Sequence, residues 1–75
     1  MSESRHFTAL IYREEAGYVA LCPELDVASQ GDSVEEASAN LREAVELFIE
    51  SADPSEIEGR MRGEMYVTAL EVTAG

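Results

Sequence analysis

The sequence predicts a single α+β domain with the element order β-β-β-α-β. Three observations predict it. Residues 5–30 hold three short apolar stretches separated by turn-forming residues, as expected of a meander of strands. Residues 33–52 carry apolar side chains at three- and four-residue spacing, which is typical of an amphipathic helix. Residues 64–73 return to the composition of a strand, and a chain of 75 residues is expected to form one domain, residues 1–75.

The first two strands are expected to form a hairpin. Residues 5–13 carry apolar side chains on both faces of a strand, with Phe7, Ala9 and Ile11 on one face and His6, Thr8, Leu10 and Tyr12 on the other. Residues 14–17 supply the turn, where Gly17 is available for a positive φ angle. Residues 18–22 form the second apolar run. Pro23 ends that run because proline cannot donate to a strand ladder.

A short third strand leads into the helix. Residues 27–30 have small side chains and form a weak strand, which suits the edge of a sheet. Ser33 as the N-cap and Glu36 three residues later form a capping box. The helix is expected over about residues 34–51, because the residue before Pro54 avoids helical geometry. Its apolar stripe consists of Val34, Ala37, Leu41, Ala44, Val45, Phe48 and Ala52.

The remaining residues complete the predicted topology. Residues 54–63 are expected to form a loop with room for one helical turn around residues 55–58, and residues 64–73 a fourth strand. A right-handed crossover through the helix places the fourth strand beside the first and parallel to it. The predicted sheet order is 3-2-1-4, with the one long helix packed on one face. The other face is apolar and uncovered, which predicts a homo-oligomer, with a dimer and a tetramer both open.

Composition narrows the classes of partner. Sixteen acidic residues against five basic ones, all Arg, give a net charge of -11. This balance argues against direct DNA binding, because affinity for phosphates comes from Lys and Arg. It favours either a basic partner or simple solubility by self-repulsion. No apolar run approaches the roughly 20 residues of a membrane span, and the first residues lack the layout of a signal peptide, so a cytoplasmic protein is expected.

Catalytic and metal-binding constellations are weak in this sequence. Cys22 and His6 are the obvious nucleophile–base pair, but a lone Cys is usually a small buried hydrophobe. Asp26, Asp32 and Glu36 offer carboxylates to a divalent cation, yet turn formation and helix capping explain each of them. We therefore expect no enzyme, no catalytic residues, no metal and no cofactor.

The second half of the helix is unusually acidic. Glu43, Glu46 and Glu50 oppose the helix macrodipole near its C-terminus, and Glu46 with Glu50 is a like-charge pair four residues apart. Two explanations of this locally unfavourable arrangement stay open. The carboxylates bind the basic surface of a partner, or they form a solvent-exposed face that has no partner. With Glu24 and Asp26, these three residues are the expected partner-binding set.

The chain resembles the HicB-like antitoxin family over about residues 7–50. Three segments carry the resemblance: Tyr18-Val19-Ala20, then Cys22-Pro23-Glu24-Leu25, then Gly31-Asp32-Ser33-Val34-Glu35-Glu36-Ala37 with Asn40-Leu41 and Glu43-Ala44 after it. The resemblance implies a partial ribonuclease-H-like fold and an oligomeric antitoxin of a toxin–antitoxin system. Such a protein binds and blocks a small basic HicA-type toxin that cleaves RNA.

One departure separates the chain from many members of that family. They carry a C-terminal DNA-binding domain with which they repress their own operon, whereas this chain stops at Gly75. A short, stand-alone member without that domain is expected, and its part in autorepression stays open. Two alternatives stay open. One is a stand-alone oligomeric structural or regulatory module without a toxin partner. The other is a ribonuclease-H-like protein that binds nucleic acid, although the first two strands offer none of the clustered acidic metal ligands such chemistry needs.

Overall fold

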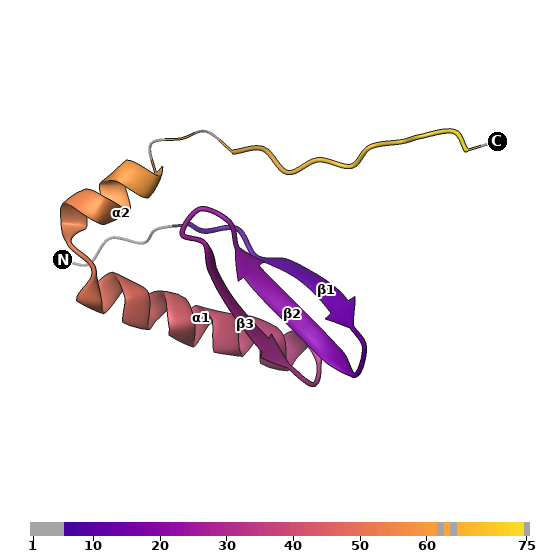
Figure 1. Ribbon diagram of the computed structural model, residues 1–75, viewed down its shortest axis with the longest axis horizontal. Coiled ribbons are helices and arrows are strands. Elements are labelled where there is room, and N and C mark those ends of the chain that lie inside the picture. The colour runs from indigo at the N-terminus through magenta and orange to yellow at the C-terminus, as the bar shows by residue number, and fades with distance from the viewer. Residues whose placement is uncertain (1–5, 62, 64, 75) are drawn as a thin grey trace.

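An antiparallel sheet and two helices make up the fold over the residues that the computed structural model describes, which are 6–61, 63 and 65–74 (Figure 1). The α+β class and the antiparallel meander of three strands are as predicted, and the sheet order is β1-β2-β3. The elements are β1 (Leu10–Glu14), β2 (Gly17–Cys22), β3 (Val27–Gly31), α1 (Val34–Ser51) and α2 (Pro54–Met61).

The strand register decides which side chains face the helix. β1 pairs with β2 from Leu10 opposite Leu21 to Glu14 opposite Gly17, and β2 pairs with β3 from Tyr18 opposite Gly31 to Cys22 opposite Val27. Because side chains alternate along a strand, the face that bears Ala20 and Cys22 turns toward α1. The opposite face bears Leu10, Tyr12, Val19, Leu21 and Ala28. The long helix thus covers one face of the sheet, as expected.

The start of α1 is fixed by its cap. The Ser33 hydroxyl accepts a hydrogen bond from the Glu36 backbone N–H at 3.0 Å, and Glu36 Oε1 accepts one from the backbone N–H of Asp32 at 3.1 Å. The capping box is therefore present, with the carboxylate reaching one residue farther back than the usual arrangement. Asn40 adds a side-chain hydrogen bond of 2.7 Å to the carbonyl of Gln30 in β3. The helix spans the predicted residues because these local signals agree.

The core lies between α1 and the sheet. Its buried side chains are Ala20, Cys22, Leu25, Ala37, Leu41 and Val45. Cys22 is fully buried and forms no disulfide, as expected of a lone cysteine that packs as a small apolar residue. Ile57 of α2 is also buried.

Residues 54–63 are more regular than expected. Eight of them form α2, and Arg60 near its end donates a hydrogen bond of 2.8 Å to the carbonyl of Leu25. The Arg60 guanidinium also lies over the Phe48 ring, 5.4 Å from its centroid, and pairs with Glu56 at 3.3 Å. The expectation of a loop was wrong because these tertiary contacts, together with burial of Ile57, stabilise a helix that is too short to persist alone.

The fourth strand is not formed within the described residues. Of the expected strand 64–73, residue 64 lies outside them, and residues 65–73 are not part of the described sheet. Every residue from 65 to 74 is exposed, and the segment extends away from the sheet (Figure 1). The radius of gyration is accordingly 14.6 Å, against about 11 Å for a compact chain of this length. In the described part of the chain the order 3-2-1 is present without strand 4, because residues 65–73 form no ladder with β1 there.

Two glycines should respond oppositely to alanine. A Cβ on Gly31 would lie 2.6 Å from the backbone nitrogen of Ala37, so Gly31→Ala should destabilise the fold by about 1–3 kcal/mol through overpacking. A Cβ on Gly59 in α2 meets nothing within 4 Å, so Gly59→Ala should stabilise by up to about 1 kcal/mol. Urea unfolding of both variants checks this. Equal effects of the two changes would contradict a close approach of α1 to β3.

Candidate partner-binding surface

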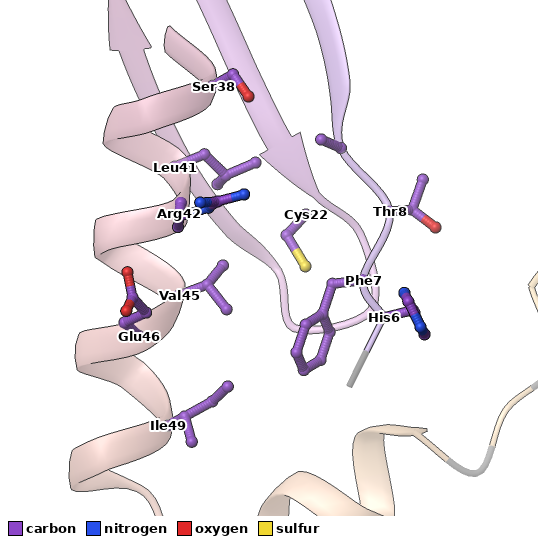
Figure 2. A pocket seen from close by; sticks show the side chains of 11 residues that line it. His6, Phe7, Thr8, Cys22, Ser38, Leu41, Arg42, Val45, Glu46 and Ile49 are labelled. Carbon is purple, nitrogen blue, oxygen red and sulfur yellow. The ribbon is translucent and has the colours of Figure 1, made fainter. Parts of the chain in front are cut away.

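An open groove of about 640 Å³ runs between α1 and the chain that leads into β1 (Figure 2). On the α1 side, Leu41, Val45 and Ile49 line it at helical spacing. Phe7 lies on the other side, and Cys22 lies between the two (Figure 2). The remaining lining residues are His6, Thr8, Ala9, Ser38, Arg42 and Glu46. The groove therefore has apolar walls with polar and charged groups around them.

Glu24 holds the chain segment that forms one side of this groove, through hydrogen bonds to Thr8. Its carboxylate accepts hydrogen bonds from the Thr8 backbone N–H at 2.9 and 3.1 Å, and from the Thr8 hydroxyl at 2.7 Å. The Cys22 thiol donates to the same carboxylate at 3.6 Å. Burial alone would raise the pKa of Glu24, but these hydrogen bonds outweigh it and hold that pKa below its ordinary value. The carboxylate thus ties the approach to β1 to the β2–β3 turn.

The Cys22 thiol is placed as a neutral group. Burial raises its pKa, the Leu25 backbone opposes this in part, and the negative charge of Glu24 raises the pKa further. The expected nucleophile–base pair of Cys22 and His6 does line one groove, but the nucleophilic form of a cysteine is the thiolate. A thiol with a raised pKa is less ionised than an ordinary cysteine at neutral pH.

The five expected partner-binding residues lie in two places. Glu43, Glu46 and Glu50 are exposed on one side of α1, and the last turn of that helix contains no basic residue. Glu24 and Asp26 lie in the β2–β3 turn, where Asp26 is exposed with a φ of 55°. Arg60 contacts both that turn, at Leu25, and the second half of α1, at Phe48. The structure therefore brings the two places to the same end of the molecule, and their role toward a partner stays a prediction.

Sequence reasoning missed a second acidic hollow, of about 500 Å³, at the opposite end of the sheet. Glu14 at the end of β1 and Glu15 in the β1–β2 turn line it, together with Asp32 and Glu36 from the entry to α1. The predicted meander already places that turn and the helix entry at one end of the sheet. This shared position could have indicated the hollow from the sequence. Within the described part of the chain, no three His, Cys, Asp or Glu side chains form a group that could hold a metal ion.

A UPF0150 protein of Helicobacter pylori (strain J99) is 34% identical to this chain over 65 residues, which are 85% of this chain and 90% of that protein. The chain belongs to the UPF0150 family. Two further UPF0150 proteins, both of Synechocystis sp., are 50% identical over 48 residues and 47% identical over 38 residues.

The matches to the two Synechocystis members of UPF0150 are partial. They cover 61% and 49% of this chain, and the chain spans 61% and 53% of the length of those proteins. No family model and no solved structure matches the chain. Neither helix over the described residues has both the length and the apolar composition that crossing a membrane requires.

The role assigned to Glu24 in this UPF0150 chain predicts a pH-dependent effect. A lowered pKa means that the charged carboxylate stabilises the folded state above the unfolded value of 4.5, and that this contribution is lost as pH falls through the folded value. Glu24→Gln should therefore lower the free energy of unfolding at about pH 7 and make a smaller difference at about pH 3.

Urea unfolding of the parent chain and the variant at both pH values measures this difference. Glu43→Gln, a change on the exposed surface of α1, is the matched control and should make only a small difference at either pH. If the effect of Glu24→Gln is as large in acid as at neutral pH, its hydrogen bonds to Thr8 do not depend on the charge.

Proposed function

We propose that this protein is a HicB-like antitoxin, a binding module that recognises and neutralises a small basic HicA-type RNA-cleaving toxin. One observation carries the proposal most directly. Glu43, Glu46 and Glu50 are exposed together on α1 in a chain whose net charge is -11. The sequence segments that resemble HicB-like antitoxins provide the second support.

The physical basis is electrostatic competition. A protein that binds RNA presents a basic surface to phosphates, and an acidic module is attracted to the same surface. The charges on α1 lie on a rigid helix, so their arrangement is set before the partner arrives. Their long-range field speeds encounter with a basic partner, and added salt weakens it because the Debye length is about 10 Å at 0.1 M.

The partial ribonuclease-H-like fold belongs to the same proposal. A meander of three strands followed by a long helix supports it, as the sheet order β1-β2-β3 and the position of α1 agree with such an arrangement. The full arrangement requires a fourth strand beside β1. The neutral Cys22 thiol favours a binding role over nucleophilic catalysis.

Co-expression tests the proposal. A gene beside this one that encodes a small basic protein should inhibit growth when expressed alone, and expression of this chain should restore growth and yield a complex that co-purifies. The association rate should fall with added salt. The absence of any toxic basic neighbour, or a neighbour that this chain neither binds nor neutralises, would contradict the antitoxin role.

A pair of matched variants locates the binding face. Glu46→Gln with Glu50→Gln should weaken the complex by about two- to thirtyfold, because exposed ion pairs contribute about 0.2–1 kcal/mol each. Glu14→Gln with Glu15→Gln changes the net charge equally at exposed positions at the other end of the sheet and should have a smaller effect. Equal losses in calorimetry would show that only net charge matters.

A further inference from the structure

Residues 6–9 are attached to the fold differently from the strand that they lead into. The ladder between β1 and β2 begins with Leu10 opposite Leu21, and residues 6–9 lie outside the described sheet. Continued by two residues, the register of this hairpin places Thr8 opposite Pro23. β2 ends one residue earlier, at Cys22. The ladder with β2 therefore does not hold residues 6–9.

Glu24 supplies the acceptor that the ladder does not. Both the backbone N–H and the hydroxyl of Thr8 donate to its carboxylate, at 2.9 and 2.7 Å. Within the described chain, the hydrogen bonds of residues 6–9 all meet at this one carboxylate. Hydrogen bonds to a charged acceptor are stronger than those between neutral groups. One side chain thus provides the polar attachment of the whole segment.

Phe7 provides the apolar attachment and shields a thiol. Its side chain is partly buried against the core, although none of residues 6–9 belongs to that core. Figure 2 shows Phe7 on the same side of the segment as Cys22 and α1, whereas Thr8 points away from α1. Cys22 is 0% exposed although it lines the open groove. Phe7 is therefore part of what separates the Cys22 thiol from solvent.

We propose that residues 6–9 form a lid over Cys22 and the groove, which the Glu24 carboxylate holds closed and which opens while the sheet and α1 stay folded. A segment with few buried apolar contacts opens at a lower free energy than the core. The lid has two attachments, the Phe7 side chain and the bonds from Thr8 to Glu24. Neither is shared with the ladder of β1 and β2 or with the packing of α1 on β3.

The lid determines how much of the groove a molecule in solution can reach. Opening moves Phe7 away from the α1 wall of Leu41 and Val45 and uncovers Cys22 between them. It also gives Glu24 a role within the chain. This carboxylate was expected to contact a partner, and in the lid it is a positioning residue that keeps Thr8 in place.

The reactivity of the Cys22 thiol tests the lid. The full chain is mixed with dithiodipyridine, an uncharged thiol reagent, at urea concentrations far below the unfolding midpoint. Opening of the lid exposes little surface, so the labelling rate should be measurable and independent of urea. A rate that rises from the lowest urea concentration with the slope of global unfolding would overturn the proposal. Absence of labelling below the midpoint would overturn it as well.

A threonine variant tests the part of the Glu24 bonds. Thr8→Val keeps the shape of the side chain and the charge beside Cys22, but removes the hydroxyl donor. It should raise the labelling rate without urea by about tenfold, because a hydrogen bond to a charged group is lost, and the rate should stay independent of urea. Thr68→Val makes the same change at an exposed residue outside the lid and should leave the rate unchanged.

Equal rates for the parent chain and Thr8→Val would show that Glu24 does not hold the lid, and would overturn the proposal. Circular dichroism should show the same fold for all three chains. No toxin takes part in these measurements, so their outcome is separate from that of the antitoxin test.

Discussion

The close approach of α1 to β3 determines the rest of the structure. Gly31 allows it, since any Cβ there would collide with the backbone of Ala37, and the Ser33–Glu36 cap starts the helix immediately afterwards. Asn40 then holds α1 to the carbonyl of Gln30. Because α1 packs along β3, it covers only part of β2. A groove remains between α1 and residues 6–9, which lead into β1. The contact between α1 and β3 at Gly31 therefore explains why the groove lies on the other side of the fold, beside β1.

Hydrogen bonds involving two charged side chains stabilise the segments that α1 does not cover. Glu24 hydrogen-bonds to Thr8 and fastens the chain that enters β1, where the helix gives little support. Arg60 does the same for α2 by binding the Leu25 carbonyl in the neighbouring turn. Both interactions involve a charged side chain and a backbone group, and such hydrogen bonds contribute more than neutral ones. They therefore hold segments that apolar burial alone would leave loose.

Elements with local signals were predictable from the sequence, and those that depend on distant contacts were not. The capping box and apolar spacing gave α1 its observed bounds, and Pro23 marked the end of β2. Pro54 follows the end of α1 as predicted, yet proline also favours the first position of a helix, which it occupies in α2. On the surface, helical spacing placed Glu43, Glu46 and Glu50 together correctly. The bond from Glu24 to Thr8 spans sixteen residues and had no local signal.

Charge is unevenly distributed over the surface of this chain. A chain with a net charge of -11 repels its own copies, so two copies can meet stably only where their contact surfaces carry little charge. Residues 65–74 carry one carboxylate, Glu71, and their other side chains are uncharged. Of the α1 carboxylates, Glu46 lines the groove beside β1, whereas Glu43 and Glu50 are exposed outside it. The acidic side of α1 therefore meets the apolar groove at Glu46, and a molecule bound at either surface would contact that residue.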